Sequence, residues 1–292
     1  MANGIVIVDK PADWTSQDVT ARLRRVFQTR RIGHGGTLDP MATGVLPVFV
    51  GRATRAVEFF EHAEKAYVAT VRLGLTTDTE DIWGRTLTES PVSATKEEVE
   101  KALARFVGKQ MQTPPMYSAV KIGGKKLYEL ARAGKEVERQ PREIEILALR
   151  LLSYSEKEFE IYVACSKGTY VRTLCKDIGA ALGCGGCMSA LRRVQAGDYK
   201  IEQAIPLEKL LESSEKGENM EKYLLPVDSM FASYPAVTLS AKQERLCRNG
   251  NAFACKNAPG KYRLYGQTGA FLALANCQNG TMTTIKSFFE VG

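Results

Sequence analysis

The stretch that decides the fold of this chain is Gly33-His34-Gly35-Gly36-Thr37-Leu38-Asp39-Pro40-Met41-Ala42-Thr43-Gly44-Val45-Leu46-Pro47. Its four glycines indicate a backbone that bends tightly or lies close against other groups. Pro40 fixes its own φ angle and favours an extended backbone at Asp39, the one carboxylate in the stretch. The apolar run at residues 45–50 predicts a buried strand. The stretch therefore predicts a carboxylate on a stiff loop that is anchored to the core, as catalytic groups often are.

A purely structural reading of the same residues stays open at this point. Asp-Pro pairs often start turns, and a glycine-rich turn needs no function. The stretch lacks the G-x-x-x-x-G-K-[ST] pattern of a phosphate-binding loop, and its G-x-G-G sequence is not a dinucleotide-binding fingerprint. No second carboxylate and no His and Cys residues with zinc-ligand spacing lie nearby in the sequence.

Residues 33–47, followed by Gly51-Arg52-Ala53-Thr54-Arg55, resemble the signature of the TruB family of pseudouridine synthases. The match is long, nearly gap-free and centred on the family's nucleophilic aspartate, here Asp39. The resemblance implies an isomerase that converts a uridine in RNA to its carbon-linked isomer, with no cofactor and no metal. It covers residues 4–195 strongly and the remainder weakly. It implies an α+β fold with a mixed, largely antiparallel central sheet flanked by helices, and a small C-terminal PUA-like β domain.

Composition fits a protein that binds a polyanion. The 292 residues carry a formal net charge of +7, and a basic balance favours nucleic acid as a partner without proving it. Seven cysteines, an odd number, and no recognisable export signal favour a reducing cytoplasm over a disulfide framework. No stretch approaches the length of a membrane span, so we expect no membrane association.

Two domains are expected, a catalytic domain at residues 1–230 and an RNA-binding domain at residues 231–292. The second region holds seven Lys and Arg against two Glu, a net charge of 7 − 2 = +5. Its short strand patterns at 262–265, 271–275 and 282–285 are separated by glycine-containing turns, including Asn279-Gly280.

Periodicity and capping signals predict the elements of the catalytic domain. Ser16 is a candidate cap for a helix with Val19 and Leu23 on one face, and Thr95-x-x-Glu98 is a capping box. Residues 76–81 are predicted to form a polar, acidic loop. Further strands are predicted at 4–8, 65–74, 144–154 and 159–165, and further helices at 53–62 and from 169 to 183.

The resemblance also implies roles for site residues beyond Asp39. The run Ser166-Lys167-Gly168-Thr169-Tyr170-Val171-Arg172-Thr173-Leu174 matches a family motif whose arginine, Arg172, pairs with the aspartate; a guanidinium forks naturally onto a carboxylate. Tyr67 resembles the tyrosine that stacks on the target base, and Tyr170 and Leu191 line the same pocket by analogy. His34 resembles the histidine that holds the base flipped. Lys10 supports the aspartate loop from beneath.

An insertion at about residues 112–142 mixes Lys and Arg with Tyr and breaks at Gly123 and Gly124. This composition predicts a mobile, basic hairpin-and-helix arm suited to gripping a nucleic-acid backbone, with a solvated loop as the alternative. The segment strongly resembles the TruB insertion that closes over an RNA stem-loop. Four cations are predicted to touch the RNA backbone, namely Lys121, Lys125, Lys126 and Arg132.

Cys184-Gly185-Gly186-Cys187 has the C-x-x-C spacing of metal and redox sites. A zinc site needs two more ligands, and the sequence offers no second pair with matching spacing. A thioredoxin-like site needs its own βα context. We therefore interpret both residues as incidental thiols and predict that the protein holds no metal.

The leading hypothesis is a stand-alone, monomeric tRNA pseudouridine(55) synthase that acts on the T-arm and needs no protein partner. One alternative is the archaeal and eukaryotic type of relative, which uses guide RNA within a ribonucleoprotein. Another is a non-catalytic RNA-binding or tRNA-folding protein. The chemistry also leaves two routes open, since Asp39 can attack the sugar or help remove one of its protons.

Overall fold

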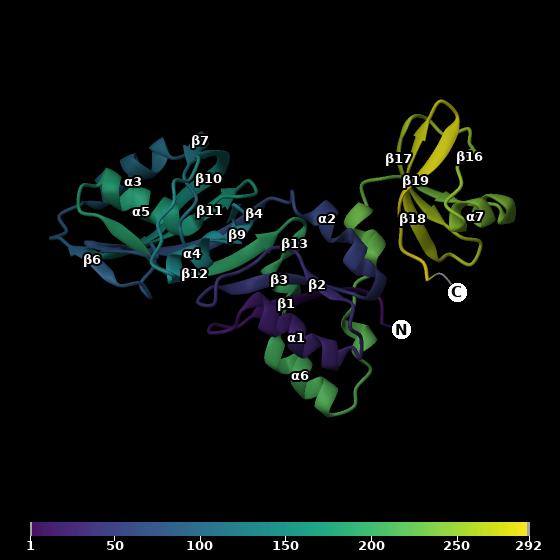
Figure 1. Ribbon diagram of the computed structural model, residues 1–292, viewed down its shortest axis with the longest axis horizontal. Coiled ribbons are helices and arrows are strands. Elements are labelled where there is room, and N and C mark those ends of the chain that lie inside the picture. Colours follow the sequence, from purple (N-terminus) through teal and green to yellow (C-terminus); the bar gives the residue numbers. More distant parts are fainter. Residues whose placement is uncertain (1, 291–292) are drawn as a thin grey trace.

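A ten-stranded mixed sheet forms the centre of the molecule in the computed structural model, which describes residues 2–290 (Figure 1). The neighbouring pairs β1–β14 and β3–β12 run parallel, and the other pairs of this sheet run antiparallel. This confirms the predicted α+β class with a mixed, largely antiparallel sheet. The strands are β14 (Ile205–Pro206), β1 (Gly4–Lys10), β3 (Thr43–Val50), β12 (Gly186–Ala196), β4 (Lys65–Leu73), β11 (Glu158–Cys165), β10 (Arg142–Tyr154) and β7 (Gly108–Gln112), with β13 (Tyr199–Lys200) paired to β12 and β2 (Ile32–His34) paired to β3.

Helices cover this sheet at both of its ends. In Figure 1, α1 and α6 lie against the β1–β3 end, whereas α3 and α5 lie at the β10–β11 end. The predicted apolar faces are buried, with Val19 and Leu23 of α1 and Val99 of α3 fully inaccessible. These helices are α1 (Ser16–Val26), α3 (Lys96–Arg105), α5 (Val171–Ala181) and α6 (Leu207–Glu215).

Shorter helical segments connect the main elements. The helix predicted over 53–62 is split into a 3₁₀ segment and a single α turn. The segments are η1 (Gly51–Ala56), α2 (Val57–Phe60), η2 (Ile201–Gln203), η3 (Met220–Tyr223) and η4 (Val227–Phe231). No helix within residues 2–290 combines the length and the apolar character needed to cross a membrane.

The two predicted helix caps had different outcomes. The capping box of Thr95 and Glu98 is present. The prediction for Ser16 was wrong, because Thr15 has the extended backbone of an N-cap and forms a reciprocal box with Asp18. Ser16 is instead the first helical residue, and its hydroxyl points away to the backbone of Leu38, accepting from the amide at 2.9 Å.

A separate five-stranded sheet follows at the C-terminal end. The turn Asn279-Gly280 has positive φ at both residues, 50° and 71°, which fits the predicted tight hairpin. The sheet has its own hydrophobic core. Leu274 and Phe288 also pack in a second cluster, together with Phe231 of η4 and Phe60 of α2. Its elements are β15 (Ala236–Thr238), α7 (Ala241–Arg248), β16 (Phe253–Ala254), β17 (Gly260–Tyr265), β18 (Phe271–Gln278) and β19 (Thr281–Ser287).

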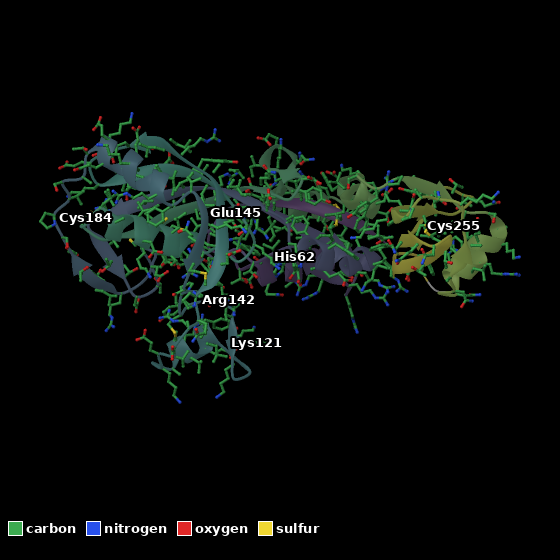
Figure 2. All side chains as sticks on the ribbon, turned by 90° about the horizontal axis from the view of Figure 1, so that it is seen from above. His62, Lys121, Arg142, Glu145, Cys184 and Cys255 are labelled. Carbon is green, nitrogen blue, oxygen red and sulfur yellow. The ribbon has the colours of Figure 1, made fainter. Side chains whose placement is uncertain are left out.

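The insertion stands between two strands that pair with each other. Gln112 at the end of β7 is opposite Arg142 at the start of β10, so residues 113–141 leave and re-enter the sheet at one point. They form a small hairpin and a short helix, as predicted, and the end that carries Lys121 projects from the body (Figure 2). The elements are β8 (Lys121–Ile122), β9 (Lys125–Lys126) and α4 (Leu127–Arg132); a second hairpin, β5 (Leu75–Thr77) and β6 (Thr86–Glu89), follows β4.

Candidate active site

The candidate site lies where β3, β12 and β4 run side by side in the central sheet. Arg193 of β12 is opposite Gly44 of β3 and also opposite Tyr67 of β4. Leu191 is opposite Ala69 on the same pair of strands. The register therefore brings the end of the glycine-rich stretch, Tyr67 and the region around Leu191 together, although they are far apart in the sequence.

Residues 35–42, here called the Asp39 loop, connect β2 to β3 and are fastened on several sides. Leu38 is held by Ser16, which both accepts from its amide and donates to its carbonyl. The carbonyl of Pro40 accepts from the ammonium of Lys10 at 3.1 Å and from the amide of Asp13 at 2.9 Å. The loop is thus rigid on both sides of Asp39, as the glycine and proline content predicted.

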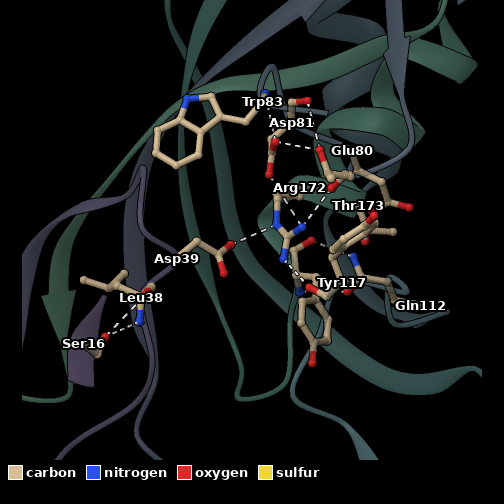
Figure 3. Close-up of polar contacts among 12 residues, drawn as sticks. Ser16, Leu38, Asp39, Glu80, Asp81, Trp83, Gln112, Tyr117, Arg172 and Thr173 are labelled. Atoms are coloured by element: carbon tan, nitrogen blue, oxygen red, sulfur yellow. Dashed lines mark hydrogen bonds and ion pairs between the residues drawn. The ribbon is translucent and has the colours of Figure 1, made fainter. Parts of the chain in front are cut away.

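Asp39 forms an ion pair with Arg172, as the motif predicted. The distance from Arg172 Nε to Asp39 Oδ2 is 2.9 Å (Figure 3). The carboxylate side chain is 38% exposed, whereas that of Arg172 is only 6% exposed. The buried guanidinium therefore orients a carboxylate that remains accessible to a substrate.

Arg172 also binds two other segments of the chain. Its Nη1 donates to the carbonyl of Thr79 at 2.8 Å, and its Nη2 donates to the carbonyl of Tyr117 at 2.8 Å. Tyr117 belongs to the insertion. A single side chain from the start of α5 therefore connects the Asp39 loop, the turn after β5 and the base of the arm.

Residues 76–81, predicted as a polar, acidic loop, begin at the end of β5 and continue into a turn that carries three acidic side chains. Glu80 and Asp81 are both buried. Glu80 accepts from Lys176 and from the hydroxyl of Thr173, each at 2.5 Å. A polar run can be buried when every charge in it finds a partner, and the spacing of acidic residues alone does not show where those partners come from.

Asp81 is a second carboxylate at Arg172, which sequence reasoning missed. Its Oδ2 lies 3.6 Å from Arg172 Nη1, and its Oδ1 accepts from the hydroxyl of Thr79 at 2.7 Å. Burial raises the pKa of Asp81 above its ordinary value, and the Thr79 hydrogen bond and the Arg172 charge oppose that shift. Asp39 and Asp81 therefore share one guanidinium.

The predicted pocket residues lie around this pair. Tyr67 and Leu191 are nearly buried on neighbouring strands. Burial raises the pKa of Tyr67, and the charge of Arg193 opposes the shift. Tyr170 precedes α5, where the amide of Gln112 binds both its N–H (2.8 Å) and its carbonyl (3.1 Å).

Arg193 is a buried cation that sequence reasoning did not single out. It is 1% exposed, and it forms no ion pair within residues 2–290. Its Nε donates to the carbonyl of Val45 at 2.6 Å and its Nη2 to that of Gly36 at 3.2 Å. Arg193 thus connects the start of the Asp39 loop, at Gly36, to β3. The Arg192-Arg193 pair directly after Leu191 was the available signal.

His34 and Lys10 flank the loop, and burial lowers the pKa of both. The Lys10 ammonium, fully buried, donates to the carbonyls of Pro11, Trp14 and Pro40, and its pKa falls to about 8 because of desolvation. For His34, burial is the main cause and Arg193 adds to it. The lowered pKa favours the neutral form of His34.

The four predicted RNA-contacting cations lie on the arm. Lys121, Lys125 and Arg132 are exposed, whereas Lys126 is half-buried. Lys126 and Arg132 both approach the ring of Tyr128, at 5.3 and 5.5 Å from its centroid.

Among the described residues, the C-x-x-C pair is not part of a metal-binding cluster. Cys184 and Cys187 are both buried, and burial raises the pKa of Cys187 to about 11. Within residues 2–290, three or more His, Cys, Asp or Glu side chains never gather in a metal-binding group. A thiol with a pKa as high as that of Cys187 is a poor ligand and nucleophile at neutral pH.

Two family models match the chain: "TruB family pseudouridylate synthase (N terminal domain)" over residues 24–171 and "tRNA pseudouridylate synthase B C-terminal domain" over residues 172–232. A relative named tRNA pseudouridine synthase B, from Syntrophomonas wolfei subsp. wolfei, is 45% identical over 290 residues, covering 97% of this chain and 96% of the relative. One of the same name from Coxiella burnetii is 42% identical, covering 93% and 90%. A solved chain of a Cbf5–Nop10–Gar1 complex matches with a TM-score of 0.74 at 25% identity, covering 98% of this chain and 85% of that one.

The mixed sheet and the Asp39–Arg172 site, together with these matches, define a pseudouridine synthase, an isomerase. The chain belongs to the TruB family. The resemblance drawn from residues 33–47 is confirmed.

Proposed function

We propose that this chain converts uridine 55 in the T-arm of tRNA to pseudouridine. The observation that carries the proposal is the Asp39–Arg172 pair, a partly exposed carboxylate held by a buried guanidinium on the family's motif. The relatives at 42–45% identity that are named tRNA pseudouridine synthase B support tRNA as the substrate.

The reaction is an isomerisation with no net change of atoms. The bond between C1′ of the ribose and N1 of uracil breaks, and a bond between C1′ and C5 forms. The hydrogen on C5 leaves as a proton and N1 gains one. The nucleotide must leave its stack before Asp39 can reach the sugar, and both routes considered above start from that carboxylate.

The other site residues have supporting roles in this proposal. Arg172 orients Asp39 through their ion pair, and Tyr67 stacks on the uracil. Tyr170 and Leu191 line the base pocket. His34 helps to hold the base in its flipped position, and Lys10 holds the Pro40 end of the loop.

Binding and chemistry are divided between regions in this proposal. Residues 1–230 carry the reaction, and the arm and residues 231–292 bind RNA phosphates. Two of the seven C-terminal cations are neutralised, since Arg248 pairs with Glu244 and Lys286 with Glu58. The other five form no ion pair within residues 2–290. Arg263 donates to the carbonyl of Tyr234 and to the hydroxyl of Tyr265, and four remain available for phosphates: Lys242, Arg245, Lys256 and Lys261.

The protein works as a monomer in the cytoplasm, without guide RNA or a protein partner. All seven cysteines, each within the described residues, are unpaired, which fits a reducing compartment. The likeness to a chain of a Cbf5–Nop10–Gar1 complex favours a guide-dependent synthase as the second candidate. Identity is much higher to the relatives named tRNA pseudouridine synthase B, so the stand-alone activity ranks first.

The test is an assay of purified protein on an unmodified tRNA transcript, with no guide RNA and no added protein, followed by mapping of every pseudouridine. We expect product at position 55 alone, and none with Asp39→Asn. Product at another position would refute the site assignment. Binding without product would favour the non-catalytic alternative, and product only after addition of guide RNA would favour the second candidate.

A further inference from the structure

The turn between β5 and β6, residues 78–85, is fixed by many polar contacts. Ile82 N–H donates to the carbonyl of Met188 at 3.0 Å, and Met188 N–H donates to that of Glu80 at 3.0 Å. A Cβ added to Gly84 would lie 2.3 Å from the hydroxyl oxygen of Thr79, so the turn closes tightly. Two of its acidic side chains are buried, Asp81 against Arg172 and Glu80 against Lys176. The turn is therefore a rigid support.

Trp83 stands on this support with its ring in solvent. Its backbone N–H donates to Asp81 Oδ1 at 3.1 Å, yet the residue is 55% exposed. An indole gains more from burial than most side chains, and tryptophan is rarely left in water without a partner. The only other tryptophan in the sequence, Trp14, is half-buried and has the Arg22 guanidinium over its ring at 5.9 Å. The placement of Trp83 indicates a surface that is kept ready for a ligand with an aromatic face.

The place of Trp83 connects it to the reaction. Asp81, which fixes its backbone, shares Arg172 with Asp39. Figure 3 shows the indole projecting from the turn toward the side on which the Asp39 loop lies. Because an unstacked RNA loop exposes base faces to its protein partner, stacking on aromatic rings is a common way to bind it.

We propose that the Trp83 indole is a stacking platform for an unpaired base of the substrate RNA next to the flipped uridine. The proposal rests on the proposed function, since it needs an RNA loop at the Asp39 site. It assigns to Trp83 a base-binding role that is separate from the phosphate contacts of the arm. Because the turn is rigid, the ring already has a fixed position before RNA binds. Little conformational entropy is therefore lost at Trp83 on binding.

Intrinsic fluorescence tests the contact directly, because each tryptophan can be removed singly. In a protein with Trp14→Phe and Asp39→Asn, Trp83 is the sole tryptophan and the RNA is not consumed. Titration with a synthetic T-arm stem-loop should quench and shift its emission. The matched protein with Trp83→Phe and Asp39→Asn should show a much smaller change. Unchanged Trp83 emission at RNA concentrations that saturate binding in a filter assay would overturn the proposal.

Kinetics test whether the contact contributes to binding. Trp83→Ala should raise the KM for the stem-loop by roughly 5- to 100-fold, the range expected for one stacked base, with little change in the single-turnover rate at saturation. Trp83→Phe should recover most of the loss. Leu87→Ala on β6 is the matched control, since Leu87 is also 55% exposed on the same hairpin, and it should leave KM unchanged.

The outcomes separate the two proposals. Trp83→Ala is expected to fold normally because the ring is exposed, and a thermal melt checks this. An unchanged KM in folded Trp83→Ala, or an equal effect of Leu87→Ala, rejects the stacking role. Failure of the wild-type protein to modify uridine 55 rejects the proposed function instead, and the fluorescence titration with the same RNA still reads out the stacking contact.

Discussion

The Asp39 loop and the arm that carries Lys121 both contain glycines, yet buried side chains hold the loop in place whereas most of the arm is not buried. The loop is held by buried side chains from four different elements, namely Lys10, Ser16, Arg172 and Arg193. In the arm, Leu127 is the one buried residue between positions 119 and 143. The end of the arm that carries Lys121 projects from the body of the protein (Figure 2).

This difference separates two tasks. A reacting carboxylate needs a fixed geometry, which packing and buried hydrogen bonds provide. Contacts to RNA phosphates need charge and reach, which exposed lysines on a lightly packed segment provide. We therefore expect changes in the loop to alter rate and changes in the arm to alter affinity.

The largest effect is expected from Asp39→Asn. The amide keeps the shape of the side chain but removes its charge and nucleophilicity, so the single-turnover rate should fall by ~10⁴-fold or more. RNA affinity should stay within a small factor, because the arm is untouched. Rapid-quench assays and filter binding on the same preparation measure both quantities. Appreciable product, from protein free of wild-type enzyme, would contradict the role of Asp39.

Arg172→Lys should have the next largest effect. Lysine keeps the charge, but its single nitrogen cannot replace the planar fork in which Nε, Nη1 and Nη2 each bind a different partner, namely Asp39, Thr79 and Tyr117. The single-turnover rate should fall by about 10²- to 10³-fold, the typical cost of losing a preorganised electrostatic contact. Arg192→Lys is the matched control on a neighbouring strand, since Arg192 pairs with Asp9 instead. Equal losses in the two variants would contradict the special place of Arg172.

Because the pKa of Lys10 is lowered, we expect the reaction rate to depend on pH, with an effect of intermediate size. Its pKa in the folded protein is about 8, below the value of about 10.4 in an unfolded chain. Above pH 8 the amine keeps two N–H groups for three carbonyls, so the Pro40 end of the loop loosens and the rate should fall, with a midpoint at about 8. Lys10→Arg stays charged and should lack this limb; an identical limb in both proteins would exclude Lys10.

The same group has the opposite effect on stability. Between pH 8 and about 10.4 the unfolded chain keeps the proton that the folded protein has lost, so the contribution of Lys10 to the free energy of unfolding rises with pH. Denaturant titrations of wild type and Lys10→Arg across that range measure the difference. A wild-type curve that falls relative to Lys10→Arg would contradict the lowered pKa.

A smaller effect is expected from Lys125→Ala on the arm. The loss of one phosphate contact should weaken all RNAs by a similar few-fold factor and flatten the salt dependence by roughly one contact. The single-turnover rate at saturation should not change. Lys101→Ala, which removes an exposed lysine from α3, is the control. A lower saturating rate in Lys125→Ala would remove the contrast between arm and loop.

The smallest effect is expected from EDTA. The stem-loop is assayed in monovalent salt, so that chelation does not unfold the RNA, and the rate should be unchanged. Zinc found by elemental analysis in stoichiometric amount, and lost together with activity in Cys184→Ser, would overturn the prediction that the protein needs no metal.

Several local features of this protein could be predicted from the sequence, because each depends only on residues that are close together in the chain. The fixed φ of Pro40 and the glycines around Asp39 predicted a stiff loop, Thr95 and Glu98 predicted a helix start, and Asn279-Gly280 predicted a hairpin. Each of these signals acts within a few residues. The motifs around Asp39 and Arg172 also predicted the ion pair, because both resemble motifs of the TruB family.

Only the tertiary structure decided which distant groups complete the site. Thr79 accepts from Arg172 across 93 positions, and Arg193 reaches Val45 across 148. Glu80 and Asp81 belong to a polar, acidic run, yet both are buried. The hydroxyl of Ser16 accepts from the amide of Leu38, 22 positions away. A buried charge is stable only where the fold supplies its partners, and those partners come from strand register and turn packing, which no local pattern contains.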